Sequence, residues 1–182
     1  TLNGLTFTVT DVETGEHADF ATSVVGEHNV PNILLATAVA VHEGIPLRDV
    51  ALRARNLQPA ESRLVRQTTA QGITIINDAY SANPVGTVSA LKVLGMHDSG
   101  RRLVITPGMV ELADLHDSEN RKLGTHIARY ATDVILVGAE QTQPIKTGLE
   151  DSAFPADRLK VVAELREAVD WYRDNLKPVS RE

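Results

Sequence analysis

The chain has 182 residues, a net charge of −6 and 42% apolar residues, a composition typical of an ordinary globular protein with one or two small domains. The negative charge and the lack of a long basic run argue against a nucleic-acid-binding surface, because neutralising phosphates requires clustered Lys and Arg. Without cysteine, neither disulfides nor thiolate metal sites can form. No apolar run has the length of a membrane span and the first residues do not resemble a signal peptide, so we expect a cytoplasmic protein.

The first third of the chain predicts a hairpin and two helices. Alternating apolar and polar side chains indicate strands with one solvated face, whereas small and apolar residues at helical spacing, bounded by Gly and Pro, indicate helices. We expect strands at residues 5–10 and 17–25 and helices at residues 29–44 and 45–57. Asn29 is expected to cap the first helix.

Polar residues around these helices have two interpretations each. Asn29 and Asn32 lie one turn apart, where they either serve the helix start or face a ligand. Residues 58–63 break the helical pattern and predict a domain boundary. Arg63 is the last residue of this segment, either as a solvated charge or as a fixed cation directed at phosphate or ribose.

From Gly72 onward, predicted strands and helices alternate without interruption. This order is typical of an α/β protein with a Rossmann-like, doubly wound, mostly parallel sheet. We expect strands at residues 72–76, 102–106, 133–137 and 159–162, and helices at residues 84–94, 118–130, 142–149 and 163–175.

The segment Asn77–Pro84 follows the first of these strands. It places an acid, Asp78, an aromatic ring, Tyr80, and an amide, Asn83, between a parallel strand and its helix, which is where open α/β sheets bind ligands. The alternative is an Asx turn with a good helix cap. Asn83 is suited to that cap because Pro84 favours the first helical turn.

Two further polar segments, Thr106–Leu112 and Gly138–Glu140, end the next strands. The carboxyl ends of parallel strands share one edge, so we expect the three segments to line one cleft. Glu111 in the second segment either pairs with an amine or a cation, or compensates the dipole of a helix start.

Several kinds of active site are absent from the sequence. There is no Gly-x-x-x-x-Gly-Lys-Ser/Thr loop to hold a triphosphate, and no Gly-x-Gly-x-x-Gly after a strand. The histidines do not form the close pair of a zinc site, and no serine lies in a nucleophile elbow. The chain alone therefore offers no metal site and no catalytic residue that we can name.

Taken together, four motifs resemble those of the Mur ligase family. They are Gly26-x-His28-Asn29-x-x-Asn32 before an alanine-rich helix, Arg63-Leu64 after a short linker, Asn77–Pro84, and Thr106–Leu112. The Tyr-x-Ala-Asn-Pro form within the third motif favours the member that adds D-alanyl-D-alanine to UDP-N-acetylmuramoyl-tripeptide. Ser81 stands where this ligase usually has asparagine, and Asn120 where some members have histidine.

The resemblance implies that the chain is a fragment of a three-domain enzyme. Residues 1–58 would be the end of the central ATP-binding domain, and residues 59–182 the C-terminal glutamate ligase domain, truncated at its end. The family's phosphate loop, its magnesium-binding glutamate and its carbamylated lysine have no counterpart here. We therefore expect the fragment alone to bind ATP weakly and to catalyse no ligation.

The resemblance also implies an ATP- and Mg²⁺-dependent peptide ligase of peptidoglycan precursor synthesis. Its substrates would be UDP-N-acetylmuramoyl-tripeptide and D-alanyl-D-alanine. By the same resemblance, Asn29 and Asn32 would lie against adenine, Arg63 against ribose or phosphates, and Asp78 against the ribose hydroxyls. Tyr80 and Asn83 would face the nucleotide or the dipeptide, and Glu111 is a further candidate for substrate binding.

Two alternatives remain open at this stage. One is another amide ligase of the superfamily, of the folylpolyglutamate or cyanophycin synthetase type. The other is a module that binds a nucleotide or a partner protein without catalysis.

Overall fold

The computed structural model describes residues 1, 3–61, 63–80, 82–97 and 99–176. The chain forms two compact units. Unit 1 is Thr1–Gln67 with Thr74–Ser81, and unit 2 is Thr68–Ile73 with Ala82–Glu182. Ser81, where the sequence is expected to depart from the family, and residues 177–182 lie outside the described residues.

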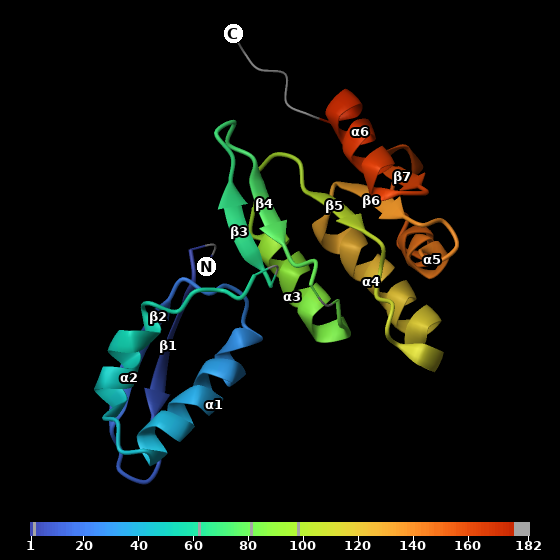
Figure 1. The fold of residues 1–182 in the computed structure, drawn as a ribbon. Helices are drawn as coiled ribbons and strands as arrows, with labels where there is room; N and C mark the ends of the chain where they lie inside the picture. The colour runs from blue at the N-terminus through green and yellow to red at the C-terminus, as the bar shows by residue number, and fades with distance from the viewer. Residues whose placement is uncertain (2, 62, 81, 98, 177–182) are drawn as a thin grey trace. The chain divides into compact units, whose positions relative to one another are not determined.

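Unit 1 begins with the predicted hairpin (Figure 1). Strands β1 (Leu5–Thr10) and β2 (His17–Thr22) pair antiparallel. β2 ends earlier than expected because the Thr22 hydroxyl accepts a hydrogen bond from the Val24 amide and turns the chain. Helices α1 (Asn29–His42) and α2 (Leu47–Ala54) follow, and their buried residues join the hairpin in one core. The predicted order of elements is confirmed.

The predicted cap of α1 is wrong. The cap residue is His28, no side chain caps the helix, and Asn29 is already helical. The carbonyls of Gly26 and Glu27 accept the Asn29 and Val30 amides at 3.0 Å, so a backbone turn replaces the side-chain cap.

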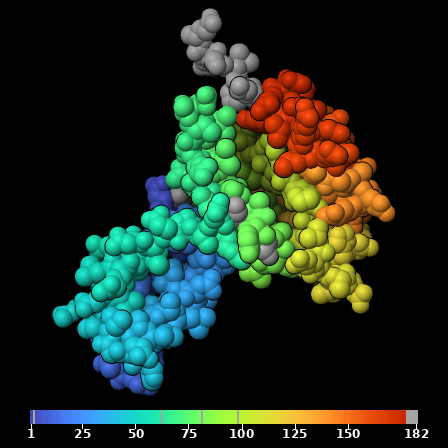
Figure 2. All heavy atoms as spheres, viewed as in Figure 1, coloured from blue at the N-terminus to red at the C-terminus, as the bar shows by residue number. Residues whose placement is uncertain are grey.

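The outer face of α1 is apolar and exposed. Leu35 is 69% and Val39 64% exposed. The blue and cyan atoms of α1 and α2 form an open surface of unit 1 in the space-filling view (Figure 2).

Strands β3 (Val65–Thr68) and β4 (Thr74–Asn77) form a two-stranded sheet. The Thr69 amide donates to the Ile73 carbonyl at 2.9 Å, and Gly72 takes the positive φ of +78° that this tight turn needs. The sequence predicts β4 as the first strand of the parallel sheet, which is wrong for the part of the chain that the structure describes. The short turn makes β3 its hydrogen-bonded neighbour instead.

Unit 2 holds the parallel sheet, in the order β5 (Leu103–Thr106), β6 (Asp133–Val137) and β7 (Leu159–Val162). Its helices are α3 (Pro84–Gly95), α4 (His116–Tyr130), α5 (Gln143–Asp151) and α6 (Leu165–Asn175). Short 3-10 turns lie at Ala113–Leu115 and Ala156–Arg158. The predicted α/β fold class is confirmed.

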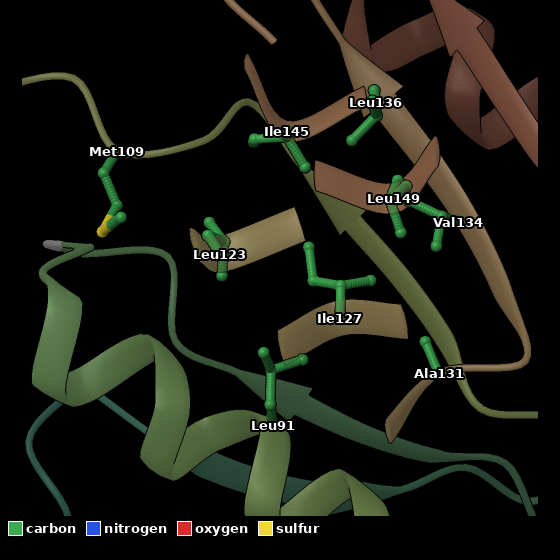
Figure 3. Packing of buried hydrophobic residues seen from close by; sticks show 9 residues of the cluster. All are labelled: Leu91, Met109, Leu123, Ile127, Ala131, Val134, Leu136, Ile145 and Leu149. Atoms are coloured by element: carbon green, nitrogen blue, oxygen red, sulfur yellow. The ribbon is translucent and has the colours of Figure 1, made fainter. Parts of the chain in front are cut away.

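The main core of unit 2 lies between the sheet and helices α3, α4 and α5. Figure 3 shows nine of its side chains: Leu91, Met109, Leu123, Ile127, Ala131, Val134, Leu136, Ile145 and Leu149. β6 is buried at four of its five residues, as expected of a central parallel strand covered on both faces. No helix in the described residues is both long and apolar enough to cross a membrane.

Candidate functional site

Asp78 lies at the end of β4, where its carboxylate is joined to the start of β3. Its Oδ1 accepts a hydrogen bond from the Leu64 amide at 2.9 Å. Leu64 is 2% exposed and has a φ of +52°, an uncommon conformation for a residue with a large side chain. Burial of its side chain and the bond to Asp78 together hold this strained turn in place.

The environment of Asp78 shifts its titration. Burial raises the pKa of this carboxyl above its ordinary value, against the opposing effects of the Leu64 amide, His28 and Arg63. The net effect is a raised pKa, because burial outweighs these interactions. Asp78 is therefore a partly desolvated acid with His28 and Arg63 near it.

Arg63 and Tyr80 lie together beside this acid. The Arg63 guanidinium carbon is 4.6 Å from the centroid of the Tyr80 ring, within the range of a cation–π contact. Tyr80 is 69% exposed and Arg63 is also exposed. The stacked pair therefore presents a flat aromatic surface and a cation to solvent.

His28 completes this cluster, and the sequence reasoning did not name it as a site residue. His28 opposes the upward shift of the Asp78 pKa, and its Nδ1 is buried without a hydrogen-bond partner in the described residues. Gly26 has a φ of +90°, and a Cβ there would lie 2.6 Å from the His28 ring and 2.7 Å from Leu64. The available signal was the position of His28 between Gly26 and Asn29 in one polar motif.

The two asparagines bond to each other and to the backbone. Asn29 Nδ2 donates to the Val25 carbonyl at 2.9 Å, and Asn32 Nδ2 donates to Asn29 Oδ1 at 3.4 Å. Asn29 is thus used mainly to hold the start of α1. Asn32 is exposed and presents its amide to solvent.

Asn83 and Glu111 belong to unit 2. Asn83 caps α3, as the sequence predicts, because its Oδ1 accepts from the Gly86 amide at 2.9 Å. Glu111 is exposed and comes just before the 3-10 turn Ala113–Leu115, which runs directly into α4. Both interpretations of Glu111, compensation of a helix dipole and binding of an amine or a cation, stay predictions.

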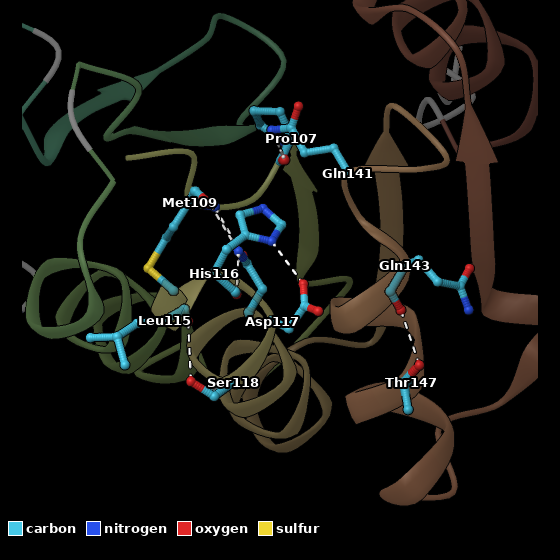
Figure 4. A network of polar contacts seen from close by, with 10 residues as sticks. Pro107, Met109, Leu115, His116, Asp117, Ser118, Gln141, Gln143 and Thr147 are labelled. Atoms are coloured by element: carbon cyan, nitrogen blue, oxygen red, sulfur yellow. Dashed lines mark hydrogen bonds and ion pairs between the residues drawn. The ribbon is translucent and has the colours of Figure 1, made fainter. Parts of the chain in front are cut away.

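Two of the three polar segments that we expect to line one cleft lie in unit 2, and the expectation of a common cleft stays a prediction. The segments after β5 and β6 meet in unit 2, where Gln141 Nε2 donates to the Pro107 carbonyl at 2.8 Å (Figure 4). An open hollow of about 640 Å³ lies along the same edge, lined in part by Glu140, Gln141 and Glu167. The Asn77–Pro84 segment is divided between the units: Asp78 and Tyr80 belong to unit 1, and Asn83 belongs to unit 2.

The cluster in unit 1 suits a nucleotide better than a metal ion. A carboxylate accepts hydrogen bonds from a diol, and a guanidinium stacked on a ring suits a phosphate or a base. In contrast, no group of three or more His, Cys, Asp and Glu side chains that could hold a metal ion occurs among the described residues.

The raised pKa of Asp78 predicts a pH-dependent stability. Between the ordinary pKa and the raised one, the folded state binds more protons than the unfolded state, so stability falls as pH rises through this window. Asp78→Asn keeps an acceptor for the Leu64 amide and removes the charge. Its stability relative to wild type is therefore expected to increase as pH rises, measured as urea midpoints from NMR amide signals of β1 and β2.

Asp11 provides a control of opposite sign in the same unit. Backbone hydrogen bonds from Glu13 and Thr14 lower the pKa of this exposed carboxyl. Asp11→Asn is expected to lose stability relative to wild type at neutral pH and to regain it as pH falls through the lowered pKa. Equal pH profiles for the two variants would contradict the assignment for Asp78.

Comparison with known proteins adds a family to this geometry. UDP-N-acetylmuramoyl-tripeptide--D-alanyl-D-alanine ligase from Bacillus subtilis is 27% identical over 173 residues, which cover 94% of this chain and 37% of the relative. The structure of MurF from Acinetobacter baumannii has a TM-score of 0.78 at 25% identity, covering 95% of this chain and 36% of that one. MurF from Thermotoga maritima, solved in complex with ADP, shares the fold with a TM-score of 0.68 at 14% identity, covering 90% and 35%.

The chain thus spans little more than a third of the length of the proteins that it matches. The family model described as "Mur ligase, glutamate ligase domain" matches residues 62–180, which is more than half of the chain. This match includes Arg63, Asp78 and the loop that follows β5. The α/β fold, the convergence of these motif residues and the family match lead to one conclusion: the chain belongs to the Mur ligase family.

Proposed function

We propose that this chain is part of an ATP-dependent ligase that joins D-alanyl-D-alanine to UDP-N-acetylmuramoyl-tripeptide in the cytoplasm. The ligase from Bacillus subtilis bears the name of this reaction and aligns with 94% of the chain. Residues 1–58 would be the C-terminal part of the central ATP-binding domain, and residues 59–182 would form the C-terminal domain.

The proposal that this chain binds ATP is supported mainly by the cluster of Asp78, Arg63 and Tyr80 in unit 1. Asp78, Arg63 and Tyr80 come from two segments of the sequence and meet at the Leu64 turn. The carboxylate of Asp78 would accept hydrogen bonds from the ribose hydroxyls, and Arg63 would face the phosphates. Asn32 would offer its exposed amide to the edge of the adenine.

The reaction explains why a ligase needs such a site. A free carboxylate and an amine form an inert salt, so the carboxylate first requires a leaving group. ATP supplies it by phosphorylating the tripeptide carboxylate, and the dipeptide amine then displaces phosphate. In this scheme the residues of this chain bind and orient the reactants. Arg63 and Asp78 hold the nucleotide, and Glu111 is proposed to hold the amine. We assign no ligand for Mg²⁺ among the described residues.

The test uses the full-length protein that contains this chain. With ATP, Mg²⁺, UDP-N-acetylmuramoyl-tripeptide and D-alanyl-D-alanine, we expect phosphate release that requires both substrates, and a product whose mass is the sum of the two less water. Glutamate in place of the dipeptide is expected to give no product.

Two results would contradict the proposal. Ligation of glutamate but not of the dipeptide would indicate another amide ligase of the superfamily. Binding of ADP, the nucleotide in the Thermotoga maritima structure, without any ligation would indicate a nucleotide-binding module.

A further inference from the structure

The loop Thr106–Leu112 follows the carboxyl end of β5. Side chains form hydrogen bonds to the backbone of three successive loop residues, Pro107, Gly108 and Met109. The Thr106 hydroxyl accepts from the Gly108 amide at 3.0 Å. Gln141 donates to the Pro107 carbonyl at 2.8 Å, and Asn120 of α4 bonds to Met109. The region of these contacts is shown in Figure 4.

Asn120 holds both polar groups of a single peptide residue. Its Oδ1 accepts from the Met109 amide at 2.9 Å, while its Nδ2 donates to the Met109 carbonyl at 2.8 Å and to the His116 carbonyl at 3.0 Å. The side chain is completely buried, so water cannot replace these bonds. One acceptor and both N–H groups of the amide are therefore used, and only one path of the loop satisfies all of them.

The neighbouring residues restrict the loop to the same path. Gly108 has a φ of +82°, and a Cβ at this position would lie 2.8 Å from Asn120 Oδ1. The Met109 side chain is 1% exposed and packs in the core of unit 2. Beyond this clamped part, Val110 is 59% exposed and Glu111 is exposed. The loop thus has a fixed inner half and presents Glu111 to solvent.

We propose that Asn120 is a positioning residue, which clamps Met109 so that Glu111 is held ready to receive the amine of the incoming dipeptide. The proposal rests on the proposed function and deepens it. A carboxylate on a pre-ordered loop binds an ammonium or amine group without paying the entropy of ordering the loop on binding. Loss of the clamp should therefore weaken dipeptide binding and leave nucleotide binding unchanged.

The test compares variants of the full-length ligase. Asn120→Asp has the same shape and keeps the acceptor for the Met109 amide, but it places a carboxylate oxygen against the two carbonyls. We expect the KM for D-alanyl-D-alanine to rise by about tenfold, with the KM for ATP unchanged. Hydrogen exchange in a peptide spanning residues 106–112 should become faster.

Two further variants and one control make the result specific. Asn120→His offers one acceptor and one donor nitrogen, so the KM for the dipeptide should stay within about threefold of wild type. Gln141→Ala, at a site that does not endanger folding, removes the anchor at Pro107 and should raise this KM by about threefold. Ile127→Val lowers stability from the same helix, about two turns beyond Asn120, without changing a hydrogen bond of the loop, and should change neither KM.

The outcomes separate the two proposals. If wild type forms no product with the dipeptide, the proposed function fails and the role of Asn120 falls with it. If wild type is active but Asn120→Asp and Gln141→Ala keep the wild-type KM for the dipeptide, or raise the KM for ATP as much as the KM for the dipeptide, the positioning role alone is overturned.

Discussion

Replacing Asp78 by alanine in the full-length protein is expected to raise the KM for ATP by at least about tenfold, the effect of losing one hydrogen bond to a charged group. Asp78→Asn should give a smaller rise, because an uncharged acceptor still bonds to a hydroxyl but less strongly. The measurement is the dependence of the ligation rate on ATP concentration at saturating tripeptide and dipeptide.

The comparison of the two variants also separates binding from local folding. Alanine removes the acceptor of the Leu64 amide, whereas asparagine keeps it. Asp11→Asn is the control, since this carboxylate also accepts backbone amides but lies in the hairpin turn of β1 and β2. A KM for ATP that is unchanged in both Asp78 variants would remove this residue from the nucleotide site.

Gly148→Ala is expected to destabilise unit 2 by about 3 kcal/mol or more. A Cβ at Gly148 in α5 would lie 2.0 Å from the Arg121 carbonyl oxygen in α4, and one at Gly124 would lie 2.2 Å from the Ile145 carbonyl oxygen. Both obstacles are backbone atoms, so no side chain can turn aside to make room. The gain in helix propensity from Gly to Ala, about 1 kcal/mol, is too small to offset this clash.

Chemical denaturation followed by tryptophan fluorescence measures this effect in unit 2. Trp171 is the single tryptophan of the chain and packs against the sheet from α6. The matched control is Gly86→Ala in α3, where a Cβ would approach only the end of the Asn83 side chain at 3.2 Å. Its stability should stay within about 1 kcal/mol of wild type. Equal stability of wild type and Gly148→Ala would show that the two helices are not packed this closely.

The elements with a strong local signal were predictable from the sequence. The strand at residues 133–137 is a run of apolar, mostly β-branched residues after one acid, and the structure has it with the same bounds. The cap of α3 by Asn83 was likewise predicted, because an N-cap depends on contacts within four residues. The cap of α1 was not, since a turn of the preceding backbone provides the acceptors there.

The site residues likewise include some that sequence motifs predict and one, His28, that they do not. The motifs singled out Asn29, Asn32, Arg63 and Asp78 by residue type and order, and the fold places Asp78 against the Arg63–Leu64 segment. The roles of these residues as ligand contacts stay predictions. His28 was not singled out as a site residue, because the burial of its Nδ1 depends on Gly26 and Leu64, which are distant from each other in the sequence.

The sequence by itself determined the α/β class, the order of strands and helices, and the motifs that place the chain in its family, because these depend on side-chain type at short spacing. Only the tertiary structure decided the partner of β4, the burial of Asp78 beside Leu64, and the two hydrogen bonds between Asn120 and Met109. Each of these features joins groups that are between 6 and 14 residues apart in the sequence. For β4, the choice is which strand becomes its hydrogen-bonded neighbour. The chain adopts the arrangement that gives most buried polar groups a hydrogen-bond partner, and a local pattern of residues does not specify that arrangement.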